Sequence, residues 1–258
     1  MKKARLLLFL CVFIARVSSA DAVNVAVASN MSHAFSEIAE LYQSTSGTKV
    51  RLSFGSSGNF ARQIVQGAPY RIFLSAGSQY VDLLRSRNIE LLEDIEYARG
   101  RVGVFVPHNS ALSENSGLKS IIKKLFHGKY RRMVIPNPQH APFGVAAKQS
   151  LQSAGLWVLE SKRLLLAENA AQATQIAISG NVDVGIIPAS HAQLPEISAK
   201  GKFYPIPEDW HQPLHQHLVL VDGASQNEAA FFAFLKEDRA QKIVKNFGYS
   251  LEINALPN

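Results

Sequence analysis

The stretch FGSSGNFARQIVQGAP, Phe54–Pro69, decides how the fold of this chain is read. A glycine and two serines follow an apolar residue, and they precede a run in which Phe60 and Ile64 recur at helical spacing. Serine and glycine are preferred where a strand turns into a helix, so Ser56 and Ser57 fit a turn and a helix cap. Hydroxyl groups at a helix start can also hold a ligand, and this stretch alone leaves both interpretations open.

The same order of features occurs nearer the N-terminus. VNVAVAS, residues 23–29, is typical of a buried strand, and apolar residues at helical spacing follow from Phe35 to Tyr42. Gly47 is placed to end that helix. Ser29 therefore also stands at the end of a strand, directly before a helix.

Predicted strands and helices alternate along the rest of the chain. Further strands are expected at 49–54, 72–75, 102–106, 133–135, 164–167, 182–187 and 217–221, and further helices near 80–87, 118–126, 143–154, 170–179 and 228–235. Alternation of this kind indicates an α/β fold made of βα units and largely parallel sheets. In such sheets the ligand crevice lies beyond the carboxyl ends of the strands, where helix N-termini converge. Ser29, Ser56 and Ser57 are thus candidates for an anion site, with simple capping as the alternative.

The first twenty residues have the pattern of a secretory signal. Lys2, Lys3 and Arg5 precede an apolar run from 6 to 15, and a cut is expected after Ala20. A membrane anchor is the competing interpretation, but the run is far shorter than the roughly 20 residues of a spanning helix. The predicted mature protein is therefore exported.

Removal of the signal changes the charge and the cysteine content. Four basic residues leave, so the formal net charge falls from +7 by four to +3, which is poor evidence for nucleic-acid binding. Cys11 is the one cysteine in the sequence and leaves with the signal. An exported chain without disulfides must be held together by its core alone.

Several segments together resemble one family, the periplasmic molybdate-binding proteins that serve molybdate ABC importers. The resemblance starts with VAVASNMSHAFSEIAELYQSTSGTKVRLSFGSSGNFARQIVQGAP and continues through YARGRVGVFVP, IPNPQHAPFGVAAKQSLQSAG, LLLAENAAQATQIAISGNVDVGIIPASHA and FFAFLKEDRAQKIVKNFGY. It covers nearly the whole mature chain.

The resemblance implies a type II-like periplasmic binding protein, in which two α/β lobes joined by crossover strands close on a tetrahedral oxyanion. We place one lobe at 21–101 plus 217–258 and the other at 102–216. The resemblance further implies a monomer that binds molybdate, tungstate or a similar oxyanion and meets a membrane ABC permease. It implies no enzymatic activity and no cofactor.

The family's binding residues carry over to four positions here. Ser29 and Ser57 would supply hydroxyl and amide donors from the first lobe, and Phe143 and Ala170 would supply backbone amides from the second. Asn30 and Ser56 are additional candidates beside them.

Two positions depart from the family pattern. Pro188 stands where well-known molybdate binders have a tyrosine, and proline offers neither a hydroxyl nor an amide hydrogen. Arg71 stands where the family usually has an acid, and we expect an exposed charge there, with a cation beside the pocket as the alternative. These departures leave the identity of the oxyanion open.

The sequence also contains residues that bear on three other classes of function. A serine hydrolase is disfavoured because Asn59 occupies the glycine position of the nucleophile-elbow motif. A phosphate-binding loop would need the lysine that GSSG lacks. A metal site is conceivable at His211, His215 and His217, but without a carboxylate or cysteine beside them we expect a solvated rim.

Overall fold

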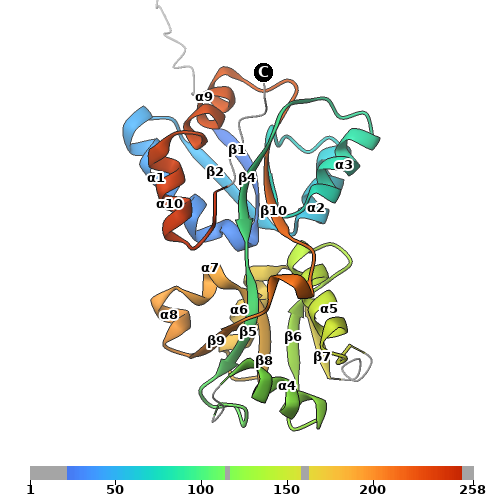
Figure 1. The fold of residues 1–258 in the computed structure, drawn as a ribbon. Coiled ribbons are helices and arrows are strands. Elements are labelled where there is room, and N and C mark those ends of the chain that lie inside the picture. The colour runs from blue at the N-terminus through green and yellow to red at the C-terminus, as the bar shows by residue number, and fades with distance from the viewer. Residues whose placement is uncertain (1–21, 114–116, 158–162, 252–258) are drawn as a thin grey trace, which may run out of the picture.

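The computed structural model describes residues 22–113, 117–157 and 163–251. The predicted signal at residues 1–20, with Cys11, lies outside the described residues. Two five-stranded sheets, each covered by helices, make up the described part of the chain (Figure 1). A two-lobed α/β architecture is therefore present, as the sequence predicted.

The first sheet has the strand order β2-β1-β3-β10-β4. Its strands are β1 Val23–Ala28, β2 Val50–Gly55, β3 Ile72–Ser75, β4 Leu91–Gly100 and β10 Leu214–Val221. β1 runs parallel to β2 and β3, whereas β10 is antiparallel to β3 and β4. We call this sheet with its helices the first lobe.

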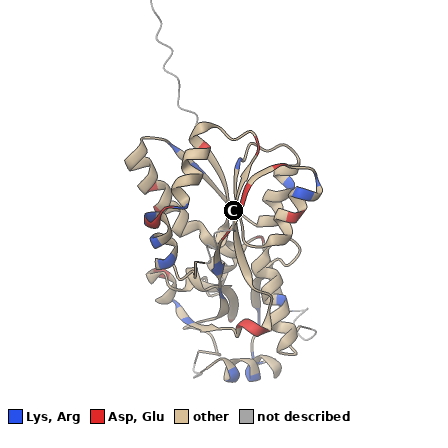
Figure 2. Cartoon of the chain, turned by 45° about the horizontal axis from the view of Figure 1, so that its top comes forward, with Lys and Arg blue, Asp and Glu red and all other residues tan. Residues whose placement is uncertain are grey.

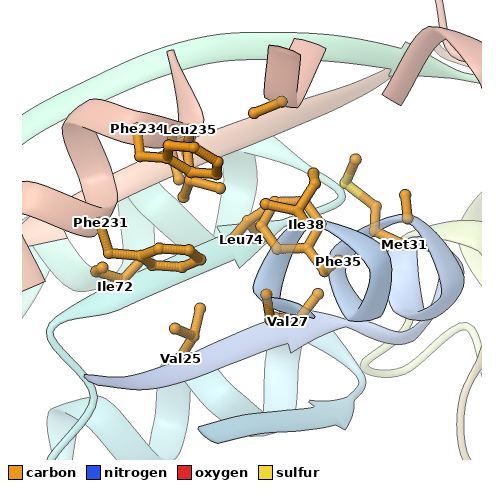
Figure 3. Packing of buried hydrophobic residues seen from close by; sticks show 14 of the residues in the cluster. Val25, Val27, Met31, Phe35, Ile38, Ile72, Leu74, Phe231, Phe234 and Leu235 are labelled. Atoms are coloured by element: carbon orange, nitrogen blue, oxygen red, sulfur yellow. The ribbon is translucent and has the colours of Figure 1, made fainter. Parts of the chain in front are cut away.

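Helices cover both faces of the first sheet (Figure 1). They are η1 Ser29–Met31, α1 Ser32–Ser46, α2 Ser57–Val65, α3 Ser78–Ser86, α9 Gln226–Leu235 and α10 Asp238–Asn246. Side chains alternate along β1, so Val25 and Val27 pack with Phe35 and Phe231 on one face (Figure 3). Ala26 faces the other side, against α2 and α3. Each large apolar side chain buried in this way contributes about 1.5–3 kcal/mol.

The second sheet has the order β7-β6-β8-β5-β9. Its strands are β5 Val102–Pro107, β6 Met133–Pro136, β7 Leu164–Ala167, β8 Val184–Pro188 and β9 Gly201–Pro205. Its helices are α4 Leu118–Phe126, α5 Pro142–Ser153, α6 Ala170–Ile178, α7 Ala189–Ala192, α8 Pro195–Ser198 and η2 Glu208–Trp210. One face packs against α4 and α5, and the other packs against α6, α7 and α8. We call this sheet with its helices the second lobe.

Two strands carry the chain between the lobes. It leaves the first lobe from β4 through Arg101 into β5, and it returns after β9 and η2 into β10 (Figure 1). β10 pairs with β4 from Leu214 onward, so the returning strand joins the first sheet before the predicted start at His217.

The prediction of largely parallel sheets is wrong, because both sheets are mixed. β10 and β5 each run antiparallel to both of their neighbours. These are the strands that enter or re-enter a lobe from the other one, so they arrive without the helical crossover that makes neighbours parallel. β4 and β9 had no strand signal in the sequence, because both are largely half-buried and carry polar residues.

Charged residues of both signs are distributed over both lobes rather than gathered on one face (Figure 2). Among the described residues, no helix is both long enough and apolar enough to traverse a lipid bilayer.

Candidate oxyanion site

A small cavity lies where the two lobes meet. Its volume is about 10 Å³, close to the space that one water molecule occupies. The residues that line it come from both lobes: Ala28, Ser29, Asn30, Gly55, Ser56, Ser57 and Ala76 from the first, and Ala141, Pro142, Phe143 and Ala170 from the second. None of these lining residues has a charged side chain. The structure thus brings all six sequence-predicted residues to one cavity.

Three α-helices begin at this cavity. α2 begins at Ser57 after β2, and α6 begins at Ala170 after β7. α5 begins at Pro142, after the loop that follows β6. The first N–H groups of a helix have no partner within that helix, and the helix dipole is positive at this end. Convergence of three such ends favours an anion over a cation or a neutral molecule.

Ser57 is completely buried beside the cavity. Its hydroxyl oxygen accepts a hydrogen bond of 3.0 Å from the backbone N–H of Ala76. A serine hydroxyl has one hydrogen and two acceptor positions, so this contact leaves its hydrogen available to donate. The fold therefore presents Ser57 as a donor.

Ser29 has the same arrangement, but its partner lies across the cleft. The hydroxyl oxygen accepts a hydrogen bond of 3.2 Å from the N–H of Ala171 in the second lobe. The hydroxyl hydrogen of Ser29 is likewise left to donate.

The second lobe places Phe143 and Ala170 at the helix starts. They are the second residue of α5 and the first residue of α6, so their amides belong to first turns. The Phe143 ring is buried against β4, since a Cβ added at Gly100 would lie 3.1 Å from Phe143 Cζ. Gly144 allows α5 to begin this close, because a Cβ there would lie 2.3 Å from the Pro136 carbonyl oxygen.

The Asn30 side chain supports the site rather than offering a spare donor, and Ser56 contacts the opposite lobe. The Asn30 side-chain amide donates to Gln216 Oε1 at 2.8 Å and to the Tyr249 hydroxyl at 2.9 Å, which uses both of its hydrogens. Ser56 Oγ lies 3.0 Å from His140 Nδ1 in the second lobe.

Contacts across the cleft show that the lobes are closed on each other. The Gly58 N–H donates to the His140 carbonyl at 2.9 Å, and Ser190 Oγ donates to the Asn30 carbonyl at 3.0 Å. His191 Nε2 lies 3.1 Å from the Ser29 carbonyl oxygen. The sequence analysis did not identify Gly58 or His191, because both residues make their contacts with the opposite lobe.

A larger crevice of about 250 Å³ lies next to the cavity. It shares Ala76 and Pro142 with the cavity lining, and its polar side chains include Gln79, Gln149 and His215. Two helices begin at this crevice, α3 at Ser78 and α5 at Pro142, compared with three at the smaller cavity.

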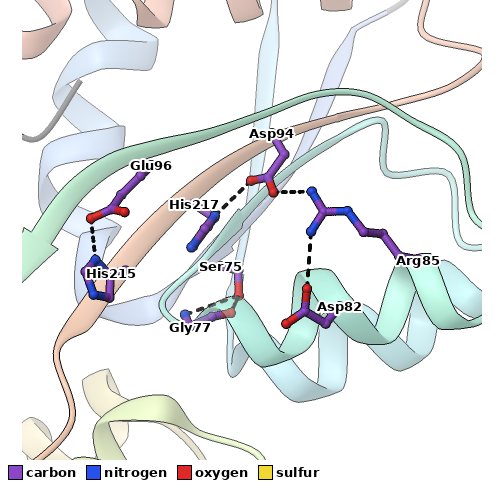
Figure 4. Close-up of polar contacts among 8 residues, drawn as sticks. All are labelled: Ser75, Gly77, Asp82, Arg85, Asp94, Glu96, His215 and His217. Atoms are coloured by element: carbon purple, nitrogen blue, oxygen red, sulfur yellow. Dashed lines mark hydrogen bonds and ion pairs between the residues drawn. The ribbon is translucent and has the colours of Figure 1, made fainter. Parts of the chain in front are cut away.

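The three candidate metal ligands do not form a metal site. His211 Nδ1 contacts the Gln212 carbonyl, and no cluster of three His, Cys, Asp or Glu side chains suited to a metal occurs within the described residues. The expectation that no carboxylate accompanies these histidines is wrong: His215 pairs with Glu96, and His217 Nδ1 lies 2.8 Å from Asp94 (Figure 4). The carboxylates come from β4, which lies beside β10 only in the fold.

Asp94 belongs to a small network of charges. It contacts both His217 and Arg85, and Arg85 also pairs with Asp82 (Figure 4). Burial alone would raise the pKa of Asp94, but the hydrogen bonds and charges of His217 and Arg85 hold that pKa below its ordinary value. These contacts stabilise the β4–β10 pair in the first lobe.

The two departures from the family pattern lie away from the cavity lining. Pro188 ends β8 and is buried at the start of α7. Arg71 directly precedes β3 and lies against the turn at Gly223, whereas the cavity touches Ala76 beyond the other end of that strand. The alternative that Arg71 is a cation beside the pocket is therefore wrong.

His191 is buried and neutral at physiological pH. Burial, and to a lesser extent the nearby His33, lowers its pKa from 6.5 to about 4, although hydrogen bonds to the backbone of Ser29 and Asn30 act in the opposite direction.

Acid is expected to destabilise the protein through His191. The unfolded chain takes up a proton near pH 6.5, but the folded chain does so only near pH 4, so stability present at neutral pH is lost as the pH falls through this window. The full difference corresponds to about 3 kcal/mol. Urea unfolding at several pH values between 7 and 4 should show a smaller loss in His191→Gln than in the wild type. Equal losses in the two proteins would contradict the assignment.

Two α/β lobes that are joined by crossover strands and closed over a small polar cavity have the architecture of a two-lobed solute-binding protein. The family model for bacterial extracellular solute-binding proteins matches residues 23–250, and the chain belongs to that family.

Individual relatives within this family give a more specific similarity than the family model does. The chain is 28% identical over 242 residues to the molybdate-binding protein ModA of Azotobacter vinelandii, which covers 93% of this chain and 94% of the relative. It is 29% identical over 246 residues to ModA of Rhodobacter capsulatus, covering 91% and 90%. The solved periplasmic molybdate-binding protein of Azotobacter vinelandii superimposes with a TM-score of 0.79 at 28% identity, over 92% of this chain and 100% of that one. The resemblance predicted from the sequence is confirmed.

Proposed function

We propose that this chain is the periplasmic receptor of an oxyanion importer, which captures molybdate or tungstate and presents it to a membrane ABC permease. The observation that carries the proposal is the convergence of three helix starts, from both lobes, on an uncharged cavity. Relatives named as molybdate-binding proteins, aligned over 91% and 93% of this chain, support the choice of oxyanion.

Neutral donors suit selective capture of a small dianion. A lysine or arginine attracts many anions because a point charge senses little of their shape. Fixed N–H and O–H groups instead select by size and by the absence of protons on the ligand. Each charge-assisted hydrogen bond contributes about 1.5–3 kcal/mol. Ser29, Ser57 and the amides at Phe143 and Ala170 are the proposed donors.

Closure of the lobes couples binding to transport. Ser29 and Ser57 stand on one lobe, and Phe143 and Ala170 stand on the other. Only the closed form brings both sets to one anion, so the anion stabilises that form. The closed shape is then what the permease distinguishes from the empty receptor.

Isothermal titration of residues 21–258 with four oxyanions tests the proposal. Molybdate and tungstate are expected to bind with dissociation constants of roughly micromolar to nanomolar. Phosphate carries a proton at neutral pH and meets a site made of donors, so it should bind at least about 100-fold more weakly. Sulfate is smaller and should also bind more weakly.

Two other results of that titration would change the conclusion. If sulfate binds most tightly, the receptor serves a different oxyanion. If none of the four binds, the proposed function is wrong.

The proposal includes no catalytic step. Ser57 contacts a backbone amide and not a histidine. Ser56 does meet His140, but that contact joins the two lobes and is made when the cleft is closed. We further propose that the receptor acts as a monomer without a cofactor. The proposed lobes are those predicted, 21–101 plus 217–258 and 102–216, except that β10 belongs to the first lobe from Leu214.

A further inference from the structure

His191 occupies a place in the closed cleft that the binding proposal does not use. It lies on α7, at the side of the second lobe that faces the first (Figure 1). Its side chain is almost entirely buried, at 2% exposure. A buried imidazole this close to an anion site needs a structural reason, because burial of a polar ring is unfavourable unless its nitrogens are hydrogen bonded.

Both ring nitrogens of His191 have partners that belong to the site. Nε2 lies 3.1 Å from the carbonyl oxygen of Ser29 in the first lobe. Nδ1 lies 2.9 Å from Oγ1 of Thr174, and that hydroxyl lies 3.0 Å from the carbonyl oxygen of Ala170. Because a carbonyl only accepts, Nε2 must carry the hydrogen, and Nδ1 of the neutral ring accepts the single hydroxyl hydrogen of Thr174. In this arrangement the Thr174 hydroxyl has no hydrogen left to donate to the Ala170 carbonyl.

These contacts close a ring of hydrogen bonds between the lobes. The chain of hydrogen bonds runs from the Ser29 carbonyl through His191 to Thr174, and the backbone of α6 links Thr174 to Ala170 and Ala171. It returns through the N–H of Ala171 to the Ser29 hydroxyl, at 3.2 Å. Ser29 and Ala170 both line the cavity. The imidazole therefore connects the two lobes at the residues that face the ligand.

The ring also engages the Ser29 carbonyl, which would oppose anion binding if it faced the ligand. A carbonyl oxygen carries a partial negative charge and repels an anion, whereas the N–H groups and hydroxyls beside it attract one. Engaging the Ser29 carbonyl on the side of His191 holds Ser29 in the orientation that presents its hydroxyl to the cavity, beside the first turn of α6. A neutral imidazole does this without placing a second charge beside the site, and the lowered pKa of His191 keeps it neutral.

We propose that His191 is a positioning residue that holds the Ser29 and Ala170 backbones together across the cleft and thereby slows release of the bound oxyanion. This inference rests on the proposed function. Because the ring of hydrogen bonds exists only in the closed form, its loss should accelerate opening more than it slows capture.

The test compares release rates in variants of the mature protein. Protein loaded with labelled molybdate is chased with excess unlabelled tungstate, and loss of label is followed with time. His191→Leu removes both polar contacts at similar volume and should release the anion roughly 10- to 100-fold faster, with association changed less than about threefold. His191→Gln keeps an N–H near the position of Nε2 and should restore release to within about fivefold of the wild type. Thr174→Val should fall between them.

His33, on α1 of the first lobe, provides a matched control. His33 meets the His191 ring edge-on, with ring centroids 5.5 Å apart, but takes no part in the ring of hydrogen bonds. His33→Phe keeps an aromatic contact and should release the anion at the wild-type rate. A purely structural role for His191 would lower thermal stability in both the Leu and Gln variants without restoring slow release in Gln.

Each outcome decides one question. If the wild type binds molybdate and His191→Leu releases it at the wild-type rate, the positioning role is wrong and the proposed function stands. If His191→Leu fails to fold, His191→Gln and Thr174→Val still test the positioning role. Release at the wild-type rate from Thr174→Val, together with fast release from His191→Gln, would contradict that role. If the wild type takes up no labelled molybdate, the proposed function itself is wrong.

Discussion

A Gly58→Ala variant is expected to bind molybdate roughly 10- to 100-fold more weakly than the wild type while remaining folded. A Cβ at this position would lie 2.8 Å from the carbonyl oxygen and 3.0 Å from the Cα of His140, which belong to the backbone of the opposite lobe. Backbone cannot rotate away as a side chain can, so the lobes must stay apart or accept strain of about 1–3 kcal/mol. That strain is present only in the closed form and therefore subtracts from binding.

The control for Gly58→Ala concerns Tyr80. The same Cβ would also lie 2.8 Å from Cε1 of Tyr80, which is in the first lobe and is present whether the cleft is open or shut. Isothermal titration of the double variant Gly58→Ala/Tyr80→Ala with molybdate separates the clash with His140 from the clash with Tyr80. If the clash across the cleft matters, the double variant remains weak. Recovery of full affinity would instead place the defect within the first lobe.

A Ser57→Ala variant is expected to lose roughly 10- to 150-fold in molybdate affinity. The lost interaction is a charge-assisted hydrogen bond to a dianion in a site shielded from water, worth about 1.5–3 kcal/mol. The Ala76 N–H donates to the Ser57 hydroxyl oxygen and so orients the side chain. This hydrogen bond does not use the hydroxyl hydrogen of Ser57, which remains available for the anion. Titration of the variant with molybdate gives the result directly.

Two further measurements accompany Ser57→Ala. Its thermal unfolding should be recorded without ligand, because loss of the acceptor for the Ala76 N–H also affects the folded protein. Ser86→Ala, which removes an exposed hydroxyl on α3, should bind like the wild type. Unchanged affinity in Ser57→Ala would show that the anion is held elsewhere.

The sequence by itself determined most of the elements and brought the candidate residues to one edge of the fold, although β4 and β9 had no signal in it. Apolar spacing in α1 from Phe35 to Tyr42, with Gly47 at its end, predicted that helix correctly. The positions of Ser29 directly after β1 and of Ser56 and Ser57 after β2 predicted that these residues would lie at one edge of a sheet. These predictions succeed because they depend on local periodicity and on the rule that parallel strands end together. The roles of these residues as ligands remain predictions.

Only the tertiary structure decided which groups meet across the cleft. The pairing of His215 and His217 with Glu96 and Asp94 depends on strands more than 110 residues apart in the chain. The link from Ser29 through His191 to Ala170 depends on how two separately built lobes close. Such contacts leave no periodic signal in the sequence, because the partners are brought together by rigid-body placement of the lobes rather than by the local conformation of the chain.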